Sequence, residues 1–229
     1  MRASFQKDMV VQDEYQLKGD SAHHLLNVVR VAMGEEILLL NGNGLTVTTV
    51  VSLISKKELG LKKLTTSLLK RSYSIDLALG IPKKEALELS LKQAVELGFR
   101  KIFLIRSKYS QIRVPDEERL ENLLVSAVEQ SNSAFMPEVI VSEWDKIPCD
   151  NYGQILLMDS KSKANNMESV LRTDARLLIV GPEAGFSNDE LTLLHSLPKV
   201  SVLNLPTPIL RTPTAVATGA GIILKSLLD

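Results

Sequence analysis

Residues 177–190 constrain the fold of this chain more than any other segment. The run Leu-Leu-Ile-Val at 177–180 is apolar throughout, as in a strand buried on both faces of a parallel sheet. A Gly-Pro-Glu-Ala-Gly-Phe loop follows, and Ser187 with Glu190 forms a capping-box pattern that begins a helix. Loops at the carboxyl ends of parallel strands usually hold the ligands of α/β proteins. The segment therefore predicts a strand, a candidate ligand loop and a helix, although a plain connecting turn fits the loop equally well.

A second strand-to-helix junction lies near the C-terminus. Residues 200–203 predict a short strand, and a proline-stiffened loop leads to Thr212 and Pro213, a favourable N-cap and N1 pair. The helix expected over 213–228 carries scarcely a charge before Lys225. A helix that is apolar all round is buried on nearly every side, and in a small domain a second subunit covers it most easily.

The periodicity of the chain changes near residue 72, so we expect two domains, at 1–71 and 72–229. The first reads as short strands separated by turn signals, with one helix from Ser21 to about Ala32, which is typical of a small β-barrel. The second alternates strands with helices, which predicts an α/β fold with a parallel sheet. Its expected strands are 75–80, 101–106, 138–141, 154–158, 177–180 and 200–203, and its expected helices are 82–97, 116–133, one beginning after Ser187, and 213–228.

Composition limits the class of protein. A chain of 229 residues with 45% apolar content can bury a sizeable core. The single cysteine, Cys149, excludes an internal disulfide framework. We find neither a signal-peptide core nor a segment long enough to span a membrane, so we expect a cytoplasmic protein. Basic and acidic residues balance at 27 each, so any RNA binding has to come from local basic patches.

Two basic segments stand out, at 56–71 and 83–113. The first holds six lysines and arginines against one acid, Glu58. Contacts of such residues with phosphates are additive and steeply salt-dependent, although surface lysines often serve solubility alone. His23 and His24, at the start of the expected helix, either touch RNA or are structural.

Short motifs occur in a fixed order along the chain. They are His23-His24-Leu25 with Val28-Val29-Arg30, Glu96-Leu97-Gly98, Glu129-Gln130-Ser131 with Pro137, the 181–186 loop, and Ile209-Leu210-Arg211-Thr212. In this order and at these spacings they resemble the RsmE family of SPOUT-class, AdoMet-dependent RNA methyltransferases, which methylate N3 of a uridine in 16S ribosomal RNA. The resemblance extends over almost the whole chain.

The resemblance implies a PUA-like RNA-binding domain at 1–71 and a SPOUT methyltransferase domain at 72–229 with a C-terminal trefoil knot. It implies a homodimer that acts on ribosomal RNA or the small ribosomal subunit, without a metal and without a membrane. Loops 156–160, 181–186 and 203–211 would hold AdoMet. The expected cofactor contacts are Asp159, Gly181, Glu183, Gly185, Leu203, Leu205, Ile209 and Leu210, and the expected RNA contacts are His24, Arg30, Lys83 and Lys108.

The chemistry singles out two catalytic candidates. AdoMet already supplies an electrophilic methyl group, so the protein must hold that group in line with the nitrogen. Uridine N3 carries a proton, and its attack requires proton removal or stabilisation of charge on O2 and O4. Arg211 suits the second task because a guanidinium stays charged and offers planar donors, unless it pairs with a carboxylate or crosses a dimer interface. Glu183 could orient the base or the amino group of AdoMet.

Some positions depart from the family pattern. Pro206 and Pro208 stand where Gly and Arg are usual, and Pro213 stands where Glu is usual. Further departures are Tyr109, Ser126 and Ser133, near positions that usually carry charges. The loops expected to bind AdoMet match the family pattern better than the positions expected near the RNA substrate. Two functions therefore stay open: a uridine-N3 methyltransferase, or a catalytically impaired SPOUT-fold protein that binds RNA, with or without AdoMet, and transfers no methyl group.

Overall fold

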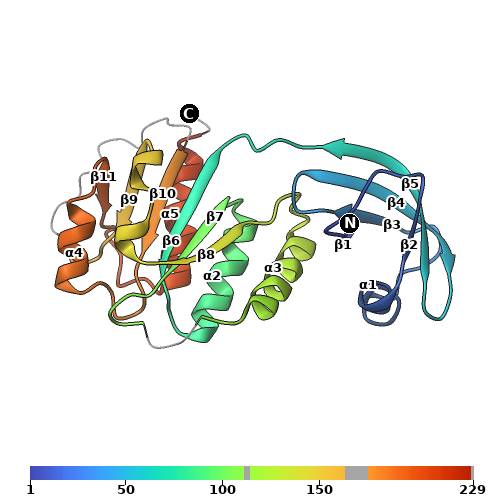
Figure 1. Cartoon of the computed structure of the whole chain (residues 1–229), viewed down its shortest axis with the longest axis horizontal. Helices are drawn as coiled ribbons and strands as arrows, with labels where there is room; N and C mark the ends of the chain where they lie inside the picture. Colours follow the sequence, from blue (N-terminus) through green and yellow to red (C-terminus); the bar gives the residue numbers. More distant parts are fainter. Residues whose placement is uncertain (111–113, 163–174, 228–229) are drawn as a thin grey trace. The chain divides into compact units, whose positions relative to one another are not determined.

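The computed structural model of the chain describes residues 1–110, 114–162 and 175–227 (Figure 1). The chain folds into two compact units. The first contains Met1–Arg71 and Val125–Met136, and the second contains Ser72–Leu124 and Pro137–Asp229. Residues 125–136, which follow the first unit by more than fifty positions in the sequence, thus complete that unit.

The first unit is built on a five-stranded sheet in the order β1-β3-β4-β5-β2. The strands are β1 (Arg2–Phe5), β2 (Glu14–Leu17), β3 (Glu36–Leu40), β4 (Leu45–Ile54) and β5 (Leu59–Leu68). β1 pairs with β3 in parallel, and the other pairs are antiparallel. β1 and β2 form the two edges, so the sheet is a half-barrel. β5 begins at Leu59, because Leu59 and Leu61 pair with β2 and fill the core.

The helix of the first unit begins two residues before, and ends about three residues before, the bounds that the sequence predicted. α1 spans Gly19–His23 and continues as a π-helix, η1, over His24–Val29. Arg30 then adopts a left-handed conformation with φ of 58° and ends the helix, so the expected extension to Ala32 was wrong. Burial explains the early end, because the helix anchors the core through Ala22 and Leu25, while Val28 is already 65% exposed.

The second unit contains a six-stranded sheet in the order β11-β9-β10-β6-β7-β8, and all its pairs are parallel. The strands are β6 (Ser74–Gly80), β7 (Lys101–Ile105), β8 (Glu138–Ser142), β9 (Gln154–Met158), β10 (Ala175–Val180) and β11 (Val200–Leu203). The predicted parallel α/β fold is confirmed. The trefoil knot stays a prediction, since 163–174 and 228–229 lie outside the described residues.

Both faces of this sheet are covered, as the apolar strands predict (Figure 1). Alternate residues of β6 pack on one face with helices α2 (Lys84–Glu96), α3 (Glu117–Ser131) and α5 (Thr212–Lys225). The opposite face packs against α4 (Asn188–His195) and the 3-10 helices η2 (Trp144–Lys146) and η3 (Cys149–Asn151). Within the described part of the chain, no helix is both long and apolar enough to cross a membrane.

α5 begins one residue before the expected start. Arg211 is its N-cap residue, and the Thr212 hydroxyl donates to the carbonyl oxygen of Gly181 at 3.2 Å, so Thr212 ties two loops together and caps no helix. The interior face of α5 lies close to the sheet at Gly219, where a Cβ atom would come within 2.6 Å of a Leu178 methyl group. Its other side is open at Thr214, Gly221 and Lys225.

Candidate active site

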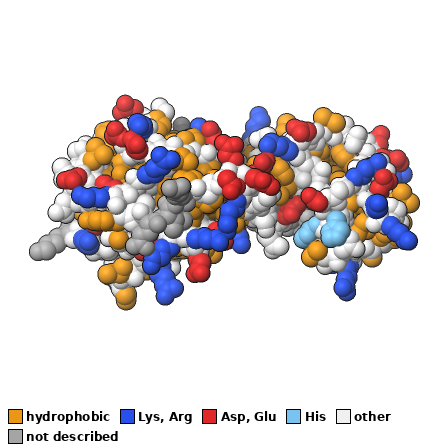
Figure 2. Space-filling model, turned by 60° about the horizontal axis from the view of Figure 1, so that its bottom comes forward, with side chains coloured by type: hydrophobic (Ala, Val, Ile, Leu, Met, Phe, Trp, Pro, Cys, Tyr) orange, Lys and Arg blue, Asp and Glu red, His pale blue; other side chains and the backbone are white. Residues whose placement is uncertain are grey.

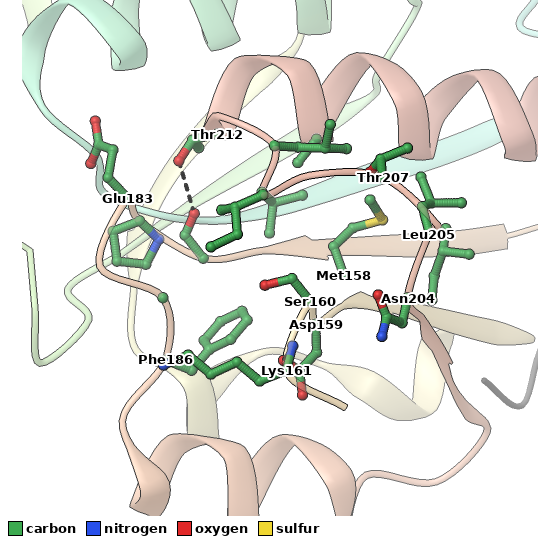
Figure 3. Close-up of a pocket in the computed structure, with 18 of the residues that line it drawn as sticks. Met158, Asp159, Ser160, Lys161, Glu183, Phe186, Asn204, Leu205, Thr207 and Thr212 are labelled. Atoms are coloured by element: carbon green, nitrogen blue, oxygen red, sulfur yellow. Dashed lines mark hydrogen bonds between the residues drawn. The ribbon is translucent and has the colours of Figure 1, made fainter. Parts of the chain in front are cut away.

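Three loops meet around a pocket of about 110 Å³ at the carboxyl ends of neighbouring strands β9, β10 and β11 (Figure 3). The lining residues of these loops lie within 159–161, 181–186 and 204–210, and Ala184 and Pro206 are not among them. Because all three strands run in parallel, their following loops emerge at one edge of the sheet. This edge is the common ligand-binding position of open α/β sheets.

The pocket gathers the cofactor residues expected from the sequence. Its lining includes Asp159, Gly181, Glu183, Gly185, Leu203, Leu205, Ile209 and Leu210. Sequence reasoning named the loops but overlooked other lining residues in and beside them, among them Met158, Ser160, Lys161, Phe186, Asn204 and Thr207. Their position within or beside the loops was the available signal. The contacts with AdoMet stay predictions for all of them.

The 181–186 loop is shaped by its two glycines. Gly185 has φ of +73°, in the left-handed region that favours glycine, and its N–H donates to the Pro182 carbonyl at 2.8 Å. A Cβ atom on Gly181 would lie 3.1 Å from the Phe186 ring. Ala184, which replaces the family's middle glycine, is exposed and has no positive φ, so an alanine fits there.

Glu183 is exposed at the rim of the pocket. Both of its carboxylate oxygens accept from the Lys83 N–H, at 3.1 and 3.2 Å, just before α2. In Figure 3 the carboxylate points away from the centre of the pocket. In this arrangement Glu183 joins the pocket loop to the N-terminus of α2, where the helix dipole favours a negative charge.

Asp159 follows β9 and is 7% exposed. One carboxylate oxygen accepts from the Lys161 N–H at 3.0 Å, which is the turn-forming role typical of a strand-end aspartate. The other lies 3.4 Å from Nε2 of His195. Asp159 thus forms a turn and also lines the pocket.

Arg211 lies between two lining residues, Leu210 and Thr212, but is not itself part of the pocket wall. Its side chain is exposed, and it has no hydrogen-bond or ion-pair partner among the described residues of this chain. Pairing with a carboxylate of the same chain therefore does not occur within the described part. The guanidinium is free to meet a ligand at the rim.

The expected RNA contacts are distributed over both units. His24 and Arg30 are exposed in the first unit, and Lys83 and Lys108 are exposed in the second. In Figure 2 basic side chains are interspersed with acidic ones. Nζ of Lys108 lies 3.6 Å from the Oδ2 carboxylate oxygen of Asp189. Arg113 of the second basic segment lies outside the described residues, and no group of potential metal ligands occurs among those described.

The second unit is a parallel α/β domain with a pocket at the carboxyl ends of its strands, and comparison with known proteins gives its class. The RNA methyltransferase domain family matches residues 69–224, and the RNA methyltransferase PUA domain matches residues 17–64. The chain therefore belongs to the RNA methyltransferase family, and the resemblance to RsmE is confirmed by its relatives.

Ribosomal RNA small subunit methyltransferase E of Rickettsia conorii is 31% identical over 207 residues, covering 86% of this chain and 83% of the relative. The Bacillus subtilis protein of the same name is 23% identical over 227 residues, covering 88% and 86%. The Neisseria gonorrhoeae enzyme bound to S-adenosyl methionine superposes with a TM-score of 0.85 at 23% identity, covering 98% of this chain and 97% of that one. These likenesses confirm the predicted RNA methyltransferase and its SPOUT-type fold.

Proposed function

We propose that this chain methylates N3 of a uridine in 16S ribosomal RNA of the small subunit, with AdoMet as methyl donor. The observation that carries the proposal is the convergence of three separate loops on one pocket. The donor suits this pocket in two ways. Leu203, Leu205 and Leu210 offer apolar contact for an adenosine, and the glycine-bearing 181–186 loop offers backbone groups at close approach. The relatives named for small-subunit ribosomal RNA methylation support the substrate.

AdoMet, when bound, would supply an electrophilic methyl group, and its sulfonium would leave as a neutral thioether. The protein then has to orient the uridine and accommodate the negative charge left when N3 loses its proton. We assign Arg211 the role of donor to O2 or O4 of the base, because it is exposed, adjoins the lining residues Leu210 and Thr212, and is unpaired within the described residues. Glu183 holds the loop against α2 through Lys83, and reorientation of its carboxylate would bring it to the base.

Two measurements test this function. Calorimetric titration of the purified chain with AdoMet should give saturable binding at one site per chain. Mass spectrometry of ribosomal RNA nucleosides from a deletion strain should show loss of N3-methyluridine, restored by the wild-type gene. Unchanged N3-methyluridine in the deletion strain would reject the proposed reaction.

The alternative is a protein that binds RNA and AdoMet without methyl transfer. Pro206 and Pro208 favour it, because they stiffen the pocket loop where the family usually has a glycine and an arginine; both are exposed, and Pro208 lines the pocket. Pro213, by contrast, is buried in the first turn of α5, where proline is well tolerated. AdoMet binding together with an unmethylated target in vitro would favour this alternative.

We also propose a homodimer and a cytoplasmic location. The open side of α5, with Thr214 and Gly221, would be covered by the partner subunit. Multi-angle light scattering should give twice the mass of 25.3 kDa, and a monomeric mass would contradict the dimer. Contact with ribosomal RNA is proposed for the first unit as a PUA-like module, and the knot is proposed for the chain segment after β10.

A further inference from the structure

Glu190, in the first turn of α4, makes more hydrogen bonds than a helix cap requires. One carboxylate oxygen, Oε2, accepts from the Ser187 N–H at 2.7 Å, as in any capping box. The other, Oε1, accepts from the Ser107 hydroxyl at 2.7 Å, the Lys108 N–H at 2.9 Å and Nε1–H of Trp144 at 2.9 Å. The last three donors come from outside α4. The Glu190 carboxylate therefore joins α4, the turn at 107–108 and η2.

This carboxylate remains ionised at neutral pH. Burial raises the pKa of Glu190, but hydrogen bonds from Ser187, Ser107, Lys108 and Trp144 outweigh burial and lower the pKa below its usual range. Hydrogen bonds to an ionised acceptor are about twice as strong as those between neutral groups. The four donors are therefore held firmly.

These contacts lie directly behind the pocket wall. Ser187 follows Phe186, whose ring lines the pocket. The Trp144 ring meets the Phe186 ring edge-on, with 5.5 Å between their centroids. The Phe186 ring also packs against Gly181, and both residues line the pocket. A shift of Phe186 would therefore change the shape of the pocket. Glu190 itself does not line the pocket.

We propose that Glu190 is a positioning residue for AdoMet binding. Its carboxylate fixes the end of the 181–186 loop and the Phe186 ring against Trp144 and the turn at 107–110, so that the pocket is preorganised for the donor. This inference rests on the proposed function for the identity of the ligand. A residue that only capped α4 would need the Ser187 contact alone.

The test uses Glu190→Gln in the full-length chain, with AdoMet as the probe. Glutamine keeps an oxygen for Ser107, Lys108 and Trp144 but turns an amide NH2 toward the Ser187 N–H. We expect the Kd for AdoMet to rise about tenfold, the loss that corresponds to roughly one such hydrogen bond to a charged group. The KM for AdoMet should rise likewise, while kcat at saturating AdoMet and the KM for RNA stay within about twofold.

Asp189→Asn is the matched control. Asp189 is the neighbouring acid in the same first turn, and its side chain is 91% exposed. Its substitution removes the same charge from the N-terminus of α4 and the exposed 3.6 Å ion pair with Lys108 Nζ, but leaves all four donors to Glu190 in place, so AdoMet affinity should stay within about twofold of the wild type. Equal losses in the two variants would mean that only the helix dipole matters and would overturn the proposal.

Trp144 supplies a second, independent readout, because it is the only tryptophan in the chain. AdoMet binding to the wild type should shift its emission through Phe186, and Glu190→Gln should shift the emission of the free protein. Trp144→Phe keeps a ring against Phe186 but removes one donor, so calorimetry should give about a threefold weaker Kd. This milder variant carries the test if Glu190→Gln does not fold.

Wild-type AdoMet affinity in both folded variants, or a loss of kcat with an unchanged KM for AdoMet, would overturn the proposal. Wild-type protein that binds AdoMet but methylates no RNA would instead reject the proposed reaction and leave the role of Glu190 standing, since that role concerns the donor alone.

Discussion

Arg211 is the residue whose position says most about the reaction. It lies at the junction of the pocket loop and α5, exposed and without an ion pair among the described residues. A guanidinium in this state can meet a substrate without first breaking a contact with the described residues. That availability suits a group that meets charge only when a substrate arrives.

We therefore expect Arg211→Ala to lower kcat by about 100-fold or more, the usual loss when a donor to developing charge is removed. AdoMet affinity by calorimetry should change less than about threefold, because the side chain lies outside the pocket wall. Arg211→Lys keeps the charge without the planar fork and should recover only part of the rate. Full activity of Arg211→Ala would remove this residue from the mechanism.

At the scale of elements, α5 is held by its close approach to the sheet. A Cβ atom on Gly219 would lie 2.6 and 3.0 Å from the two Leu178 methyl carbons and 3.3 Å from the Met158 sulfur. Met158 also lines the pocket, so packing of this helix bears on the site.

Gly219→Ala should destabilise the protein by about 1–3 kcal/mol, the usual cost of overpacking a core, and should also weaken AdoMet binding. Lys92→Ala in α2 is the control, because Lys92 is exposed and alanine favours a helix. Urea denaturation curves compare the two. Equal stability of the two variants would contradict the packing argument.

A second element-scale contact joins η3 to the start of β6 and β7. Asp76 is fully buried and accepts from the Tyr152 hydroxyl at 2.7 Å, from Nε and Nη2 of Arg100 at 3.1 and 2.7 Å, and from the Lys101 N–H at 3.1 Å. Burial, followed by the hydrogen bond to Asp76, raises the pKa of Tyr152 well above its usual range.

A raised pKa in the folded state means that the neutral phenol stabilises the protein fully below the unfolded pKa of about 10 and progressively less above it. Tyr152→Phe should cost about 1–2 kcal/mol of unfolding free energy at pH 7. The difference in unfolding free energy between the wild type and Tyr152→Phe should narrow between about pH 10 and 12. Parallel chemical denaturation series across this range would measure it, and a constant difference would argue against the contact.

At the scale of the whole molecule, RNA binding has to come from local charges, because the net charge is zero. The expected contacts lie in both units, with His24 and Arg30 in one and Lys83 and Lys108 in the other. If both units contact phosphates, each contact would add its own contribution to log K, the logarithm of the RNA association constant.

Arg30→Ala and Lys108→Ala should each weaken RNA binding and reduce the slope of log K against log salt concentration by about 0.7–0.9. The double variant should reduce it by about twice that amount. Lys146→Ala, an exposed lysine paired with Glu143 outside the expected contacts, should leave the slope unchanged. Fluorescence anisotropy at several salt concentrations makes the measurement, and an unchanged slope for Lys108→Ala would exclude that lysine from the interface.

Much of the fold could be predicted because its signals are local. The capping box of Ser187 and Glu190 and the bounds of β9 and β11 agree with the sequence, since caps and apolar runs act over a few residues. The pocket loops could be predicted for the same reason, since each loop directly follows an apolar strand that the sequence shows. The helix after Gly19 was overextended because its end depends on core contacts and a left-handed Arg30.

The amino-acid sequence by itself determined the parallel α/β pattern, the capping box of α4 and the loops of the candidate site. Only the tertiary structure decided that β9 lies between β10 and β11. It alone also decided two sets of hydrogen bonds: Glu183 accepts from the Lys83 N–H, and Glu190 accepts from Ser107 and Trp144. The physical reason is distance along the chain. These partners are 46 to 100 residues apart, and contacts closed over such separations leave no periodic or capping signal in either segment.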